Sequence, residues 1–404
     1  MIFRNRPLVR LGAAALLASG AFTVFGAPAQ AAGTETDLAI DVVGTRVAEG
    51  ASAKLAFAKV TNKGENTPSE LGVRVDLSKV DFTKVAVFPF VEGECDEEEG
   101  GKGLTSVTCW ADKESLPGPG ETIDLPVALL KATESLDKAY SAPVNFTVLS
   151  KDDTNKDNNS KSATVEFTKE SGADLAVMAD DVKNAVTVKN GKIQVAGDLH
   201  AGDTAQLIYD VWNQGDRATA GFKVTVKLPK GVTFTETEDE CEYATDKASL
   251  VCTYPELPFI PVEQWEGGDD VLPGGTFYHL LSVGANVKAG ALTGGTVSVE
   301  PILPAKTLGA QSLKIKNMPE NMAPLQETDL DPSDNTDGYA VVVAAKGGVG
   351  GGEGDGGGLP VTGAKAGLIG GIGVAVLAAG GAMFLVARRR RVVLVTPSDE
   401  KPAA

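Results

Sequence analysis

The sequence predicts an all-β protein with two tandem antiparallel β-sandwiches, flanked by an N-terminal signal peptide and one C-terminal transmembrane helix. Between Thr34 and Lys346, no long segment has helical periodicity, while short runs of alternating apolar and polar residues recur between Gly, Pro, Asn and Asp clusters. The second observation is an internal repeat, and the third is an apolar segment at each end of the chain. With 404 residues, the chain is long enough for two or three domains that each bury a core.

The internal repeat is clearest in two strand patterns. Leu71 to Leu77 reads LGVRVDL and Phe222 to Leu228 reads FKVTVKL, with apolar residues at alternate positions. The two runs start 151 positions apart, and the same offset places Val60-Thr61-Asn62-Lys63-Gly64 on Val211-Trp212-Asn213-Gln214-Gly215. We infer two copies of one domain.

Further landmarks follow in the same order in both copies. Each copy opens with an Asp-Leu-Ala run and then carries a Cys pair, a Leu-Pro-Gly turn and an Asp- and Asn-rich turn before its last strand. These landmarks are Asp37 and Asp174, Leu116 to Gly120 and Leu272 to Gly275, and Asp152 to Asn159 and Asp329 to Asp337. The predicted domains are residues 32–171 and residues 172–345, with a boundary near Ser171-Gly172. About seven short strands in each copy are typical of an immunoglobulin-like sandwich.

The second copy also resembles a known family. Val224 to Phe234 reads VTVKLPKGVTF and is followed by the Leu-Pro-Gly-Gly turn and by Asp331-Pro332-Ser333-Asp334-Asn335. This order is similar to the conserved repeat domain of unknown function in bacterial surface proteins, and to the related bacterial cell-adhesion domain. The resemblance implies an immunoglobulin-like fold and a stalk or adhesive role, and it brings no catalytic residues. The first copy has Leu77-Ser78-Lys79-Val80 where the family has Leu-Pro-x-Gly, so its membership depends on the internal repeat.

The N-terminus predicts export. A basic start with three arginines precedes the apolar run Leu11 to Phe25, and Ala29-Gln30-Ala31 offers the small residues of a cleavage site. Residues 1–31 are therefore the predicted signal peptide, and an uncleaved anchor helix is the alternative.

The four cysteines fall into two close pairs. In an exported protein this spacing predicts two local disulfides, Cys95 with Cys109 and Cys241 with Cys252. Free buried thiols are the alternative.

The C-terminus carries a fixed order of segments. Residues 346–358 are mostly glycine, and Leu359-Pro360-Val361-Thr362-Gly363 follows. Residues 364–387 are the predicted transmembrane helix, since Ala366 to Ala387 carries no charge and is long enough to cross a bilayer as a helix. Arg388, Arg389, Arg390 and Arg391 begin a tail, residues 388–404, that we place in the cytoplasm. The order resembles the LPxTG sorting signal of Gram-positive surface proteins of the actinobacterial type. The resemblance implies that a sortase cuts after Thr362 and joins Thr362 covalently to peptidoglycan, with the arginines acting as the stop-transfer signal.

We therefore predict a secreted protein of the cell wall and cell surface, whose precursor spans the plasma membrane once and which acts as a stalk or adhesin. Its predicted partners are a sortase and peptidoglycan, together with a surface ligand that the sequence does not identify. The formal net charge of -17 argues against nucleic acid as a partner. One alternative is a single-span protein that stays in the membrane, because the tail is long and the apolar segment is rich in Gly and Ala. A second is a subunit of a sortase-built pilus, for which the sequence shows no recognisable pilin lysine motif.

No group of residues predicts an enzyme, a cofactor or a metal site. His200 and His279 each stand alone among the sequence motifs. The Asp-rich turns could ligate calcium through Asp329, Asp331, Asp334 and Asp337, or through Asp152, Asp153 and Asp157. We favour structural Asx-rich turns, because neither run has the Gly and Glu positions of a helix-loop-helix calcium loop.

Two further stretches invite a functional interpretation. The acidic run Asp96 to Glu99 is predicted to be a solvated hairpin tip. We expect Trp110 and Trp212 to belong to the cores, whereas Trp265 lies in Pro255 to Gly268, an apolar insertion that the first copy lacks. An apolar loop at the end of a sandwich is a candidate recognition site.

Overall fold

The computed structural model describes residues 35–345, apart from residues 49, 52, 89–94, 101–102, 134–135, 137, 190–191, 266–271 and 304–328. The predicted signal peptide, glycine linker, sorting motif, transmembrane helix and basic tail all lie outside the described residues. Within the described part of the chain, helical structure is limited to three short 3-10 helices, and no helix is long and apolar enough to cross a membrane.

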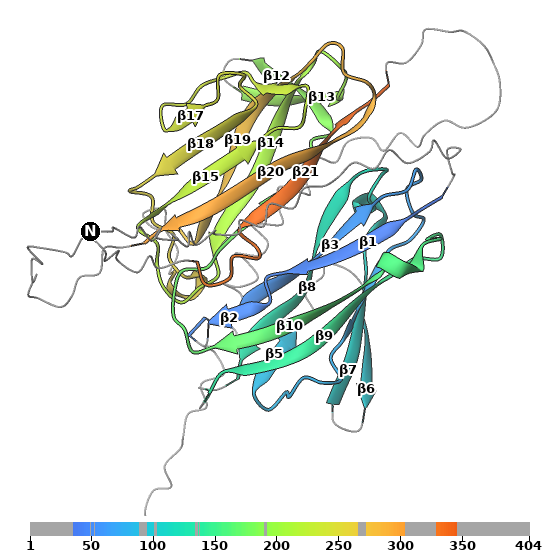
Figure 1. Ribbon diagram of the computed structural model, residues 1–404, viewed down its shortest axis with the longest axis vertical. Coiled ribbons are helices and arrows are strands. Elements are labelled where there is room, and N and C mark those ends of the chain that lie inside the picture. The colour runs from blue at the N-terminus through green and yellow to red at the C-terminus, as the bar shows by residue number, and fades with distance from the viewer. Residues whose placement is uncertain are drawn as a thin grey trace, which may run out of the picture. The chain divides into compact units, whose positions relative to one another are not determined.

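The first copy forms two sheets, which we call the first sandwich (Figure 1). One sheet has four strands in the order β1-β3-β8-β5, and the other has six in the order β2-β10-β9-β4-β7-β6. The elements are β1 Leu38–Val43, β2 Arg46–Ala48, β3 Lys54–Asn62, β4 Gly72–Asp76, β5 Val85–Phe88, β6 Cys95–Gly100, β7 Gly103–Trp110, η1 Lys113–Ser115, β8 Thr122–Ala132, β9 Tyr140–Leu149, η2 Lys156–Asn158 and β10 Ser160–Thr168.

The second copy forms another two sheets, the second sandwich. One has the order β13-β12-β14-β19-β16 with β11 also paired to β14, and the other has the order β17-β18-β15-β20-β21. The elements are β11 Leu175–Ala179, β12 Asn184–Lys189, β13 Lys192–Asp198, β14 Thr204–Asn213, β15 Gly221–Lys227, β16 Val232–Phe234, β17 Cys241–Tyr243, β18 Ser249–Tyr254, η3 Val262–Gln264, β19 Gly274–Val283, β20 Gly290–Ile302 and β21 Thr336–Val343.

Both sandwiches have the strand order of an immunoglobulin-like fold. In the first, β1, β3 and β8 share one sheet while β4, β9 and β10 share the other, which matches the A-B-E and C-F-G groups of that fold. The short β2 crosses to the second group and pairs in parallel with β10. In the second sandwich, β11, β14 and β19 and then β15, β20 and β21 repeat the arrangement, and Val182 forms the equivalent parallel bridge to Val341. The shared order is what the internal repeat predicts.

Each sandwich buries its own apolar cluster. Every second residue of β14 is buried, as the alternation of its sequence predicts. Phe146 and Phe167 lie in the cluster of the first sandwich, and Tyr209 and Phe222 lie in that of the second. Leu330, from the loop before β21, belongs to the first cluster although it follows the second Cys pair in the sequence.

The repeated Asn-x-Gly motif has the same structural task in both copies. Asn62 and Asn213 are fully buried, and each accepts a hydrogen bond from the glycine amide two residues later, at 2.9 Å from Gly64 and 3.0 Å from Gly215. Glycine is required there because a Cβ at Gly215 would lie 2.2 Å from a backbone carbonyl oxygen, that of Gly172. The motif therefore holds the end of β3 or β14 against the segment that opens its sandwich.

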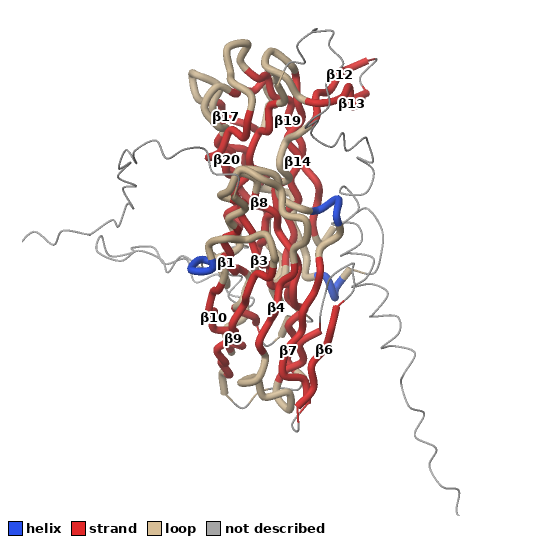
Figure 2. Tube along the Cα trace, turned by 90° about the vertical axis from the view of Figure 1, so that its right-hand side faces the viewer, coloured by secondary structure: helices blue, strands red, loops and turns tan. Residues whose placement is uncertain are grey.

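The prediction of about seven strands per copy is too low. The described residues form ten strands in the first sandwich and eleven in the second. The acidic run predicted to be a hairpin tip is edge strand β6, paired with β7 from Cys95 to Gly100 (Figure 2). Its charges stay solvated because the strand lies at the edge of its sheet, where charged side chains are common. The hairpin β12–β13 has no counterpart among the described residues of the first sandwich.

Candidate functional site

Lys54 is the most unusual residue of the described chain, because its side chain is completely buried. It begins β3 in the first sandwich, and its Nζ lies 2.7 Å from Asp174, 2.9 Å from Asp331 and 3.0 Å from Asp334. Asp174 directly precedes β11, and the other two carboxylates lie in the Asp-rich turn before β21. We call these four residues the Lys54 cluster. It joins side chains from both copies of the repeat.

The charges of the Lys54 cluster do not balance, since one ammonium faces three carboxyl groups. Burial lowers the pKa of Lys54, but the surrounding carboxylates outweigh that effect and raise it above its usual value. Burial raises the pKa of Asp174 to about 7 and that of Asp334 well above the ordinary range. For Asp331, the Lys54 charge and hydrogen bonds from Ser333 and Arg46 outweigh burial, so its pKa is lowered. Asp331 is thus the constant counter-ion, while the other two carboxyl groups hold protons more readily.

A second, largely buried group of charges follows five residues later on β3. The Lys59 Nζ lies 2.9 Å from Asp124 on β8 and forms an ion pair with Asp337 on β21. Burial, and then the neighbouring Asp337, raise the pKa of Asp124 to about 8, because one ammonium is shared between two carboxyl groups. Lys59 therefore also links the first sandwich to the second.

Backbone groups and rings complete this contact. The amide of Arg46 donates to Asp331 at 2.9 Å, and the amide of Leu55 donates to the Gln214 side chain at 2.8 Å. The rings of Phe57 and Trp212 meet edge to face, with centroids 6.0 Å apart. Trp212 thus contributes to the contact between the two copies, rather than to the core of one sandwich as we predicted.

The Asp-rich turns use their carboxylates within the protein. Asp329 accepts from the amide of Leu175 at 2.8 Å, Asp337 accepts from the amide of Ala179 at 2.7 Å, and Asp331 and Asp334 face Lys54. In the first copy, Asp152 accepts from the amide of Ser69 at 2.6 Å. No group of three or more acidic, His or Cys side chains in the described residues is arranged to hold a metal ion.

Both predicted disulfides are present in the structure. Cys95 is joined to Cys109 across β6 and β7, and Cys241 is joined to Cys252 across β17 and β18. In each case the two cysteines are directly opposite each other in an antiparallel pair. The two hairpins occupy equivalent places beside β4 and β15, so the bridges are part of the repeat.

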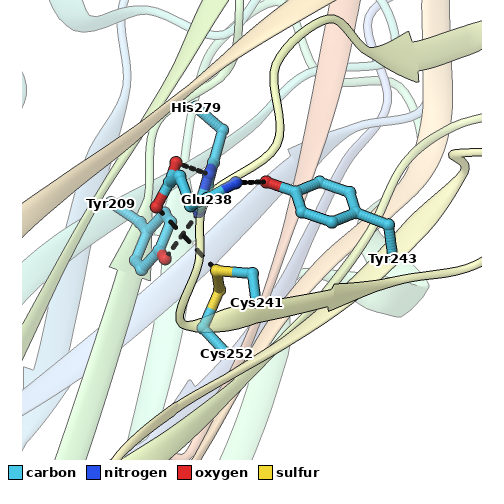
Figure 3. The surroundings of a disulfide bond; sticks show 6 residues. All are labelled: Tyr209, Glu238, Cys241, Tyr243, Cys252 and His279. Carbon is cyan, nitrogen blue, oxygen red and sulfur yellow. Dashed lines mark hydrogen bonds and ion pairs between the residues drawn. A yellow bond between two sulfur atoms is a disulfide. The ribbon is translucent and has the colours of Figure 1, made fainter.

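We predicted from the sequence that His279 stands alone, and this prediction is wrong. Figure 3 shows that His279 lies between two polar partners beside the second disulfide. Its Nδ1 is 3.0 Å from the Glu238 carboxylate and its Nε2 is 3.0 Å from the Tyr209 hydroxyl. A carboxylate only accepts, so Nδ1 carries the proton and Nε2 accepts from Tyr209. Burial lowers the pKa of His279 and raises that of Tyr209, so both are neutral near pH 7.

The chemistry open to this group is limited by burial. Tyr209 is 1% exposed and His279 is 4% exposed, so neither can reach a substrate. Their hydrogen bonds tie β14 and β19 to the loop before β17, which is a structural role. This network could not be predicted from the sequence, because Glu238 and Tyr209 are 41 and 70 positions away from His279.

The other aromatic predictions have mixed outcomes. The apolar insertion at Pro255 to Gly268 is partly core, since Phe259 is 1% exposed and stacks on Phe222 at 4.7 Å between centroids. Trp265 is half-buried at the end of η3. We predicted that Trp110 is a core residue, and this prediction is wrong. Trp110 lies half-buried on the outer face of its sheet and lines an open groove.

Lys54 and Lys59 are the functional residues that sequence reasoning missed. The available signal is their position within the otherwise apolar strand Lys54-Leu55-Ala56-Phe57-Ala58-Lys59-Val60. A lysine at a buried position of a strand requires a carboxylate partner. Its partners could not be chosen from the sequence, because they are up to 278 positions away.

No family model and no curated protein matches the chain. Among solved structures, the collagen adhesin of S. aureus is 10% identical at a TM-score of 0.21, over 77% of this chain and 94% of that chain. A biofilm-associated protein B domain is 10% identical at a TM-score of 0.23, over 66% of this chain and 81% of that one. The partial N-terminal region of an enterococcal surface protein is 9% identical at 0.22, over 67% and 91%. TM-scores this low do not support a function, and the fold assignment therefore stands on the strand order.

Proposed function

We propose that the protein is a sortase-anchored stalk or adhesin of the Gram-positive cell surface. The observation that carries the proposal is the order of the C-terminal sequence, in which a glycine run, Leu359-Pro360-Val361-Thr362-Gly363, an apolar segment and four arginines follow one another. In this scheme a sortase thiolate attacks the Thr362 carbonyl, the Thr362–Gly363 bond breaks, and a peptidoglycan amine takes the acyl group. The protein is the substrate of that reaction.

Two features of the described residues support a load-bearing role outside the cell. Each sandwich carries one disulfide, which is a usual source of stability in exported domains. The buried Lys54 and Lys59 ion pairs, with Phe57 and Trp212, connect the two sandwiches within one compact unit of the chain. A stalk benefits from such connections because they oppose the separation of its domains.

The test is fractionation of producing cells, with release by muramidase compared with release by detergent. We expect muramidase to release the wild-type protein, with a last peptide that ends at Thr362 and carries wall fragments. Thr362→Ala should stay in the detergent fraction, whereas Val361→Ala, at the variable position of the motif, should behave as the wild type. Detergent release of a wild-type chain that still carries Arg388 to Ala404 would instead favour a single-span membrane protein.

A pilus subunit is distinguished in the same cells. Sortase-built polymers resist boiling in detergent and form a ladder of covalent multimers, whereas a wall-anchored monomer does not. We expect one band after muramidase digestion.

A further inference from the structure

An open groove of about 440 Å³ lies on the outer face of the six-stranded sheet of the first sandwich. Its lining comes from β7, β9, β10 and the loops beside them, and includes Trp110, Thr147 and Ser160 together with Glu70, Lys151 and Lys156. The groove is separate from the Lys54 cluster and from the His279 network.

The indole of Trp110 packs against the neighbouring strand at a glycine. Trp110 is directly opposite Gly72 of β4, and a Cβ at Gly72 would lie 2.7 Å from Cε3 of the indole and 2.8 Å from Cζ3. Only glycine leaves room for a ring in this position. The indole Nε1 donates to Asp96 at 3.3 Å, which holds the ring in its plane. The ring therefore covers Gly72, and Trp110 also lines the groove.

Polar side chains, two of them lysines, line the rest of the groove together with Val148 and Leu149. The hydroxyls of Thr147 and Ser160 lie 3.2 Å apart. The Lys151 ammonium is 3.4 Å from Glu70, and the Lys156 ammonium donates to the carbonyl of Ser150 at 2.9 Å. Two lysines and one glutamate thus line the groove, on a chain whose formal net charge is -17.

We propose that this groove binds an acidic saccharide. The C–H face of a pyranose ring carries partial positive charge and fits the negative face of an indole. Thr147, Ser160 and Glu70 offer hydrogen-bonding groups to sugar hydroxyls, and the ammonium groups of Lys151 and Lys156 offer counter-charges to a sugar carboxylate. A purely structural role, in which Trp110 only covers Gly72, uses the same packing but gives no reason for affinity toward a sugar.

The test measures binding to the full chain purified in detergent, by titration calorimetry. The probes are a hexasaccharide of alternating glucuronic acid and N-acetylglucosamine, and neutral hexa-N-acetylchitohexaose. We expect saturable binding of the acidic probe. Trp110→Ala should weaken it roughly tenfold or more, since aromatic anchors dominate such sites. Lys156→Met should lower the affinity for the acidic probe severalfold without changing the affinity for the neutral probe.

Two further variants keep the outcome clear. Ser160→Tyr places bulk in the groove at an exposed position without disturbing the seat of Trp110, and it should block binding with an unchanged melting temperature. Tyr278→Ala removes an aromatic side chain that is 57% exposed in the second sandwich, and it should bind as the wild type does. The proposal is overturned if neither probe binds, if both bind equally well, or if Trp110→Ala and Ser160→Tyr retain wild-type affinity. None of these results depends on wall anchoring, so they leave the proposed function to its own test.

Discussion

At the scale of single residues, Lys54 shows how a buried charge can hold two parts of a chain together. The desolvation of an ammonium costs several kcal/mol, and nearby carboxylates offset that cost only when the geometry is good. Three carboxyl groups within 3.0 Å satisfy that condition here. The same carboxyl groups are then dependent on Lys54, because without it they would repel one another inside the protein.

We predict that Lys54→Met lowers the free energy of unfolding by about 3–5 kcal/mol, since it leaves buried carboxylates without a cation. Denaturant unfolding near pH 7 measures the change. The matched control is Lys223→Met, which breaks the exposed pair with Glu300, 3.7 Å apart, and should cost less than about 1 kcal/mol. A loss of less than about 1 kcal/mol in Lys54→Met would mean that the cluster contributes little to stability.

At the scale of elements, each disulfide fastens an edge hairpin to its sheet. The bridges close loops with sequence separations of 14 and 11 residues. β17 has three residues and pairs only with β18 among the described strands, so little else holds it in place. The second hairpin also positions Glu238, the partner of His279, which lies three residues before Cys241.

We predict that replacing Cys241 and Cys252 together by Ala lowers the free energy of unfolding by about 3 kcal/mol, the cost expected from the added chain entropy of the unfolded state. Denaturant unfolding with and without reductant measures it. Reductant should destabilise the wild type through the loss of both bridges, and the variant only through the loss of the remaining Cys95–Cys109 bridge. A variant as stable as the wild type would show that the hairpin pairing alone is sufficient.

At the scale of the whole molecule, buried carboxyl groups make stability depend on pH. Burial raises the pKa of Asp174 and of Asp180 to about 7 each, and that of Asp329 to about 6. In the unfolded chain the pKa of an Asp is about 3.9. Between about pH 4 and pH 7 the native state therefore binds more protons than the unfolded state, so stability falls as pH rises. The lowered pKa of Asp331 acts in the opposite sense, and its contribution is lost only in stronger acid.

We predict that the melting temperature is highest at about pH 5 and declines by several degrees toward about pH 8. Calorimetry at constant ionic strength measures this change. Asp174→Asn is the control, because an amide does not titrate and should reduce the slope. A melting temperature that rises between these two pH values would contradict the assignment of raised pKa values to these groups.

The general fold could be predicted because its signals are local. Alternating residues in Leu71 to Leu77 identify a strand without knowledge of its neighbours, and the repeat of Asn62 at Asn213 indicates a second copy. The hairpin β6–β7 was less predictable, since Asp96 to Glu99 has the composition of a solvated turn. Its assignment as a strand depends on pairing with β7 and on the bridge from Cys95 to Cys109.

The sequence by itself determined the all-β class, the two copies, the two local cysteine pairs and the order of the terminal segments on which the proposal of export and sorting depends, because each depends on residues near one another in the chain. Only the tertiary structure decided the partners of Lys54 and His279 and the packing of Trp110 against Gly72. Asp174 and Asp331 are 120 and 277 positions from Lys54. Many carboxylates were available to that lysine, and the packing of the sheets selected among them by bringing only a few within range of a buried ammonium.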